Sequence, residues 1–193
     1  MEVRQKIFRR GRGKTMQIKK SIIIISILIF LINSSIAAPL FQILQTCINN
    51  KPYNDMVTIT KLPNEGAADQ RLDGCEEQYE FIFNAHTYGT VICNNKFYLI
   101  VYDTKIDPKL ANNRSINPEI KPGVEFTPRA IWYKIDYKHK AYLCILAPLT
   151  EQGIGSSYNQ YYVIENAFDA SSTPKLYFYF LDKNIAPITS KTL

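Results

Sequence analysis

Histidine is scarce in this chain, and the common catalytic and metal-binding patterns are missing from it. The only histidines are His86 and His139, and no two of the four cysteines stand at the C-x-x-C spacing of a zinc knuckle. There is no G-x-S-x-G, no P-loop and no H-E-x-x-H motif. The sequence therefore indicates neither a serine hydrolase nor a P-loop protein nor a zinc enzyme, and we expect no metal or other cofactor.

An apolar segment long enough to cross a membrane comfortably is also lacking at the N-terminus. The apolar run at residues 21–32 has 12 residues, whereas a membrane-spanning helix needs about 20. The run follows a basic segment and precedes small residues at Ser35 and Ala37, as in a secretory signal peptide. We expect a signal peptide over residues 1–37 and one secreted domain over residues 38–193, free of the membrane after cleavage. The alternative is a retained signal anchor.

The excess of positive charge belongs to this leader. Eight of the 23 basic residues and one of the 17 acidic residues lie in it, which leaves 15 basic and 16 acidic residues in the mature chain. A nearly neutral protein has no global field that attracts nucleic acid. We therefore expect no DNA partner, and any RNA affinity would require a local basic patch.

All four cysteines follow the expected cleavage site: Cys47, Cys75, Cys93 and Cys144. An even number of cysteines in a secreted domain predicts two disulfides, in any of three pairings. Roughly 156 residues remain after cleavage, which is enough for a single domain with its own core, and we expect a monomer. The sequon at Asn113 predicts glycosylation in an exposed loop if the source is eukaryotic.

The mature chain consists mainly of short β-branched and aromatic segments. We expect strands at residues 56–60, 76–85, 88–93, 96–103, 129–137, 140–148, 160–165 and 174–182. Asn94 and Asn95 predict a two-residue hairpin turn, because asparagine tolerates positive φ. The one short helix is expected at residues 64–74.

Two further segments complete the organisation. Residues 38–53 are interpreted as an apolar arm, and residues 105–128, polar and rich in proline, as a long excursion with little regular structure. The whole order predicts an α+β fold in which one short helix packs on a curved antiparallel sheet. The alternative is an all-β sandwich or barrel.

The hairpin at residues 129–148 has apolar side chains on both faces. In its first strand Ile131 and Tyr133 share one face and Trp132 and Lys134 the other, and the second strand alternates in the same way around Cys144. A strand that is apolar on both faces is covered on both sides. We therefore expect this hairpin near the centre of the sheet.

Two stretches of this hairpin carry a resemblance. PRAIWY at residues 128–133 and YLCIL at residues 142–146 resemble the small secreted guanyl-specific ribonucleases of fungi. The chain is more similar still to the ribonuclease-like candidate secreted effectors of powdery mildews and related plant pathogens. The resemblance implies a ribonuclease-like fold, and the leader, the cysteines and the many tyrosines agree with it.

The chemistry of that family is only partly matched. Its enzymes use a glutamate base, a histidine acid, and an arginine and second histidine at the phosphate, so that base and acid stand on opposite sides of phosphorus. Arg129 matches the arginine, whereas Pro148 stands where the acid histidine is expected. Glu80 lies one strand early for the base, and His86, which could replace the second histidine, is also typical of a turn residue.

Three functions remain open from the sequence. The first is a non-catalytic, ribonuclease-like effector that binds a host protein or RNA, with Arg129, His86 and Glu80 as candidate phosphate-binding residues and variable loops at residues 105–128 and 151–159. The second is an active secreted ribonuclease that uses the same three residues. The third is an extracellular β-rich binding module unrelated to ribonucleases.

Overall fold

The computed structural model describes residues 38–63, 74–102, 104–123, 129–150 and 152–184, without the side chains of 38–39 and 77–80. The chain divides into two compact units, Met1–Leu40 and Phe41–Leu193. Nearly all described residues belong to the second unit, and the account below concerns that unit. The expected signal peptide, and all of the helix expected at residues 64–74 except Gly74, lie outside the described residues.

Within the described residues, an α-helix comes first and a series of strands follows it. The helix is α2 (Ala38–Asn49). The strands are β1 (Val57–Lys61), β2 (Cys75–Phe83), β3 (His86–Cys93), β4 (Lys96–Val101), β5 (Thr104–Ile106), β6 (Asn112–Asn113), β7 (Ile131–Tyr137), β8 (Lys140–Pro148), β9 (Asn159–Glu165) and β10 (Lys175–Phe180). Two short 3₁₀ turns lie at Pro108–Leu110 and Ile154–Ser157.

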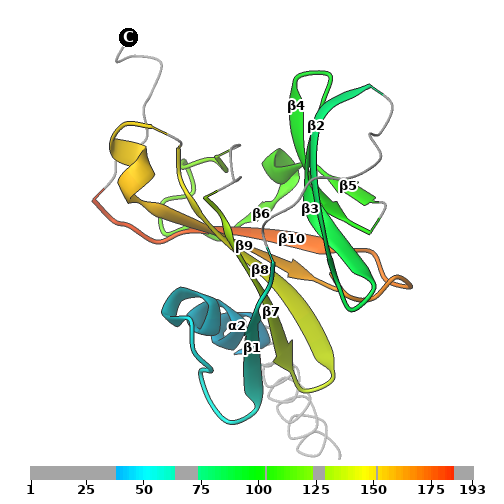
Figure 1. Cartoon of the computed structure of the whole chain (residues 1–193). Helices are drawn as coiled ribbons and strands as arrows, with labels where there is room; N and C mark the ends of the chain where they lie inside the picture. Colours follow the sequence, from blue (N-terminus) through cyan, green and yellow to red (C-terminus); the bar gives the residue numbers. More distant parts are fainter. Residues whose placement is uncertain (1–37, 64–73, 103, 124–128, 151, 185–193) are drawn as a thin grey trace, which may run out of the picture. The chain divides into compact units, whose positions relative to one another are not determined.

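The strands form a six-stranded and a four-stranded sheet. The larger has the order β1-β7-β8-β9-β10-β6 and the smaller β2-β3-β4-β5 (Figure 1). All pairs are antiparallel except β10–β6, which is parallel. The described part is thus mostly β with one short helix and a curled antiparallel sheet. The expected α+β class is confirmed at this level.

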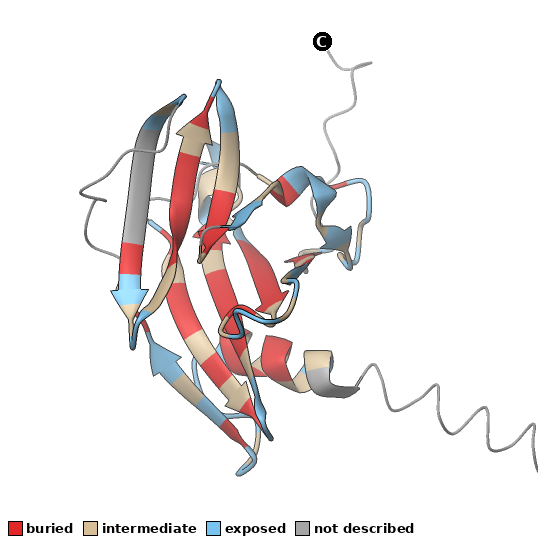
Figure 2. Ribbon diagram, turned by 90° about the vertical axis from the view of Figure 1, so that its right-hand side faces the viewer, coloured by how far each residue is buried: buried red, intermediate tan, exposed pale blue. Residues whose placement is uncertain are grey.

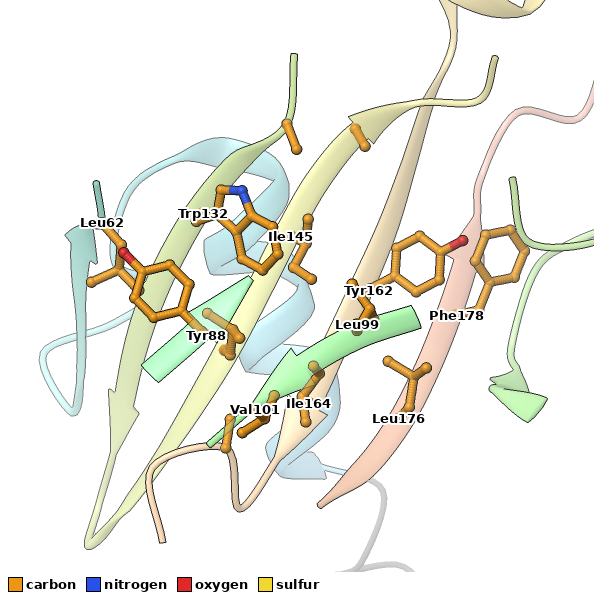
Figure 3. Packing of buried hydrophobic residues seen from close by; sticks show 14 of the residues in the cluster. Leu62, Tyr88, Leu99, Val101, Trp132, Ile145, Tyr162, Ile164, Leu176 and Phe178 are labelled. Carbon is orange, nitrogen blue, oxygen red and sulfur yellow. The ribbon is translucent and has the colours of Figure 1, made fainter. Parts of the chain in front are cut away.

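The hydrophobic core lies between the two sheets. Tyr88, Leu99 and Val101 of the smaller sheet pack in one cluster with residues of the larger sheet such as Trp132 and Tyr162 (Figure 3). Buried positions run through the middle of the strands, while exposed positions collect at hairpin turns and edges (Figure 2). The inner face of β7 and β8 is therefore filled by apolar side chains from the second sheet.

The other face of the larger sheet meets α2. Leu143 and Ile145 of β8 face the shared core, so Cys144 between them points the opposite way, where it bonds Cys47 of α2. β7 and β8 are the second and third strands of six. The expectation that this hairpin is central, with both faces covered, is confirmed.

The helix α2 corrects the interpretation of residues 38–53 as an arm. Leu40, Ile43, Leu44 and Cys47 recur at the helical spacing of three and four residues, which places them on one stripe. Ile43, Leu44 and Cys47 are 0, 7 and 2% exposed. Burial of this stripe stabilises a helix that is too short to persist alone in water.

The excursion at residues 105–128 is also more regular than expected. It contains β5, a 3₁₀ turn and β6, and the backbone N–H groups of Arg114 and Ile116 donate to the carbonyls of Phe178 and Phe180 on β10. Farther on, the N–H of Gly123 donates to Oε1 of the fully buried Gln160 at 2.9 Å. The segment is joined to the sheet edge along most of its described length.

The turns and disulfides agree with the sequence. Asn94 and Asn95 have φ of 52° and 58°, which confirms the two-residue turn between β3 and β4. All four cysteines are paired, as Cys47–Cys144 and Cys75–Cys93. The expectation of two disulfides is confirmed, and one of the three pairings is selected.

Candidate functional site

Arg129 lies outside the hairpin strands. It stands in the turn two residues before β7 begins, and its side chain is exposed. Ala130, which follows it, is 1% exposed and belongs to the core. The arginine is therefore presented at the start of β7, at the end of the strand where Ile131 pairs with Leu146.

His86 is the first residue of β3 and lies at the rim of the inter-sheet core. Its Nδ1 atom is hydrogen-bonded to the hydroxyl of Tyr102. Its ring stands edge-on to the rings of Tyr102 and Phe168, with centroid distances of 5.4 and 5.5 Å. His86 is half-buried and held on two sides by aromatic rings.

Tyr102 makes this contact from an unfavourable backbone conformation. Tyr102 is in the turn directly after β4 and has φ of 52°, a left-handed conformation that is unfavourable for a bulky residue. Its N–H donates to the carbonyl of Thr87 at 2.8 Å. Such a conformation costs about 1–3 kcal/mol and persists only where the surroundings impose it. Strain of this kind is frequent at binding sites, which draws attention to the cluster around His86.

Burial raises the pKa of Tyr102, and the nearby carboxylate of Asp169 raises it further. The hydroxyl therefore stays protonated at neutral pH and can donate its hydrogen to Nδ1. A histidine that accepts at Nδ1 carries its proton on Nε2. In either tautomer, Nδ1 of His86 is engaged by the Tyr102 hydroxyl.

A charged pair completes the cluster. The Nζ atom of Lys134 lies 5.7 Å from the centre of the Phe168 ring and donates to both carboxylate oxygens of Asp136, at 2.5 and 2.6 Å. The carboxylate neutralises the ammonium group. We refer to His86, Tyr102, Lys134, Asp136 and Phe168 as the histidine cluster.

His86 and Arg129 lie on different elements. His86 begins β3, and its ring contacts Phe168, which Lys134 of β7 also approaches. Arg129 lies in the turn before β7, five residues before Lys134. Glu80 pairs with Gly89 in the middle of the β2–β3 ladder, and its side chain lies outside the described part.

The sequon residue Asn113 is not in an exposed loop, which corrects that expectation. It lies in β6, is partly buried, and its Nδ2 atom donates to the carbonyls of Pro118 and Ile120 at 3.1 and 2.9 Å. A glycan on Nδ2 would replace one of those hydrogens. Glycosylation at Asn113 stays a prediction, and these bonds weigh against it in the folded protein.

Sequence reasoning named only His86 among the members of the histidine cluster. The alternation in β7 placed Lys134 and Asp136 on the same face as Trp132, and a charged pair on a core-facing side was the signal that could have marked them. Tyr102 and Phe168 come from distant strand ends and carry no local signal.

Within the described ranges, no group of three or more histidine, cysteine or acidic side chains could hold a metal ion. No α-helix in that part of the chain is both long and apolar enough to cross a membrane. Comparisons with family models, with curated proteins and with solved structures found no match.

Proposed function

We propose that the chain is a secreted, non-catalytic effector with a ribonuclease-like arrangement of helix and sheet, and that it acts by binding a host protein. The signal peptide at residues 1–37 directs its secretion. The chain keeps the scaffold of the ribonuclease hairpin without its chemistry.

One observation carries the non-catalytic part of this proposal. Pro148, at the end of β8, stands where the resemblance expects the acid histidine. RNA cleavage in this mechanism needs an acid and a base on either side of one phosphate, with a cation beside it. A proline side chain can neither donate nor accept that proton, so the hairpin lacks the acid of the mechanism.

The packing around β7 and β8 supports the same view. The helix covers one face through the Cys47–Cys144 bond, as a ribonuclease-like fold requires. The opposite face is filled by Tyr88 and Leu99 of the second sheet, which pack against Ile145 and its neighbours. An RNA strand would have to displace this core to reach the inner face of the hairpin.

A protein partner is favoured over RNA by charge and by exposed aromatic surface. The mature chain is nearly neutral, and in the histidine cluster Lys134 is neutralised by Asp136. Phe41 and Tyr53 are 53 and 49% exposed and stand edge-to-face with ring centroids 5.7 Å apart. Exposed aromatic side chains are enriched where proteins bind proteins.

A binding titration separates the two partner classes. Single-stranded RNA is titrated against the refolded protein, Arg129→Ala and the matched control Arg114→Ala at two salt concentrations. Arg114 is also an exposed arginine. We expect no measurable RNA binding by any of the three. Salt-sensitive binding that is lost in Arg129→Ala alone would make RNA the partner.

The second sheet favours one further candidate, a β-rich extracellular binding module unrelated to ribonucleases. The two sheets share one core, in which the ring centroids of Tyr88 and Trp132, one from each sheet, are 5.5 Å apart. Such packing of two sheets is typical of these modules. An experimental structure of a complex would distinguish them. Binding through the Phe41 and Tyr53 surface favours the effector, and a small ligand held between the sheets favours the module.

A further inference from the structure

The two disulfides of this chain lie in different surroundings. Cys47 and Cys144 are 2 and 0% exposed and join α2 to the centre of the larger sheet. Cys75 and Cys93 join the ends of β2 and β3, and Cys75 is only half-buried while Cys93 is 5% exposed. A thiol from solution can therefore approach a sulfur of the second bridge but not of the first.

A lysine stands beside the exposed bridge. The Nζ atom of Lys105, on β5, lies 3.5 Å from Sγ of Cys93 and 3.7 Å from Sγ of Cys75. No lysine or arginine contact to the Cys47–Cys144 sulfurs is found within the described ranges. An ammonium group at this distance stabilises a thiolate far more than it stabilises a neutral disulfide sulfur.

We propose that Cys75–Cys93 is a site of thiol–disulfide exchange, at which a low-molecular-weight thiol forms a mixed disulfide with Cys75 and releases Cys93 as a thiolate held by Lys105. The inference does not depend on the proposed effector function. It assigns a modification site to a face of the protein that is separate from the histidine cluster.

The exchange runs in two balanced steps. A thiolate attacks Sγ of Cys75, the more exposed of the two residues. The S–S bond breaks, and its electron pair leaves on Sγ of Cys93, 3.5 Å from the ammonium group. A second thiolate then attacks the mixed disulfide, which yields the small-molecule disulfide and a Cys75 thiolate. Two thiols are oxidised and one protein disulfide is reduced.

Lys105 acts on the rate through the leaving group. Exchange is faster when the departing thiol has a lower pKa, and a positive neighbour lowers the pKa of a cysteine. With a leaving-group coefficient of the same size as that of the attacking thiol, about 0.4–0.5, one pKa unit changes the rate about threefold. Loss of the Lys105 charge should therefore slow the opening of Cys75–Cys93, by about threefold for each unit by which the pKa of the Cys93 thiol rises.

The experiment follows each bridge in the native protein. Folded protein is exposed to 2-mercaptoethanol at neutral pH, quenched by alkylation at intervals, and mapped by peptide mass spectrometry. We expect Cys75 and Cys93 to become alkylated, and a mercaptoethanol adduct on Cys75, while Cys47–Cys144 stays intact. Equal rates at the two bridges, or earlier opening of Cys47–Cys144, would overturn the proposal.

Variants isolate the role of the charge. In Lys105→Gln, the Cys75–Cys93 bridge should open about threefold more slowly than in the natural protein, or more slowly still. In Lys105→Arg, its opening rate should stay within twofold of the natural rate. In Lys109→Gln, which removes a charge four residues away, the rate should be unchanged. Equal rates in Lys105→Gln and Lys109→Gln would contradict the assignment.

A second measurement covers the case in which Lys105→Gln folds poorly. In the natural protein with Cys75–Cys93 opened, the pH dependence of alkylation reports the pKa of the Cys93 thiol. We expect it below the ordinary value of about 8.5. An ordinary or raised value would also contradict the proposal.

Discussion

The Nδ1 atom of His86 is hydrogen-bonded to the hydroxyl of Tyr102, which lies 16 positions later and has a left-handed backbone conformation. The bond joins the first residue of β3 to the turn after β4. It engages Nδ1 only and leaves Nε2 on the other side of the ring. The pair therefore fixes the orientation of the His86 ring beside a strained residue.

Removing the Tyr102 hydroxyl should destabilise the fold slightly. We expect Tyr102→Phe to lower the free energy of unfolding by about 0.5–1.5 kcal/mol, the net contribution of one hydrogen bond. Tyr98→Phe, on the same strand, is the matched control and should change it by less. Chemical denaturation of both variants measures the difference. Equal effects would show that the His86 contact contributes nothing.

Substitution of Gln160 should destabilise the fold more than substitution of most other polar residues. The buried side chain of Gln160 donates to the carbonyl of Pro148 at 2.7 Å and accepts from the N–H of Gly123. The backbone is closely packed there, because a Cβ on Gly123 would come within 2.3 Å of the carbonyl of Leu149. Gln160→Leu leaves these backbone groups unpaired, at about 1–3 kcal/mol each. A thermal unfolding midpoint unchanged in Gln160→Leu would contradict this reading.

The two disulfides should contribute unequally to stability. Cys47–Cys144 spans 97 residues and Cys75–Cys93 spans 18. In the chain-entropy account, closing a loop of about 100 residues contributes about 4.7 kcal/mol and one of about 15 residues about 3 kcal/mol. Paired Cys→Ala variants, compared by urea denaturation, should show the larger loss for Cys47–Cys144. The reverse order would show that native packing decides instead.

Stability should fall steeply above pH 10. Burial raises the pKa of eight tyrosines in the described part of the chain, to about 12 for Tyr179. A group whose pKa is higher in the folded state stabilises the fold fully below its unfolded value of about 10 and loses that contribution as pH rises through the folded value. Tyrosinate absorbance and circular dichroism should therefore change together in alkali. Full ionisation near pH 10 with the fold intact would contradict the burial of these hydroxyls.

Much of the sheet could be predicted because its strands carry strong local signals. β-branched and aromatic residues alternate through β7 and β8, and the Asn94–Asn95 turn fixes the β3–β4 register by its chemistry. β6 could not be predicted, because two asparagines have no strand preference and pair with β10 only through tertiary contacts. The helix α2 was missed although its apolar spacing was present, since residues 38–53 were interpreted as an apolar arm of the mature chain.

The candidate site was predictable only in part for a related reason. His86 drew attention because histidine is rare in the chain, but its partners Tyr102 and Phe168 lie 16 and 82 residues farther along the sequence. Their meeting depends on how two sheets pack, which no local pattern encodes. The disulfide pairing was open for the same reason.

The most direct test of our account is RNA cleavage under single-turnover conditions, with excess refolded, disulfide-bonded protein and a labelled RNA containing guanosine, from pH 5 to 8. Arg129→Ala, His86→Ala and the control Arg114→Ala are assayed beside it. We predict no cleavage above the buffer rate for any of the four. Cleavage by the natural protein that persists in Arg114→Ala and disappears in Arg129→Ala would contradict the non-catalytic account and make the chain an active ribonuclease.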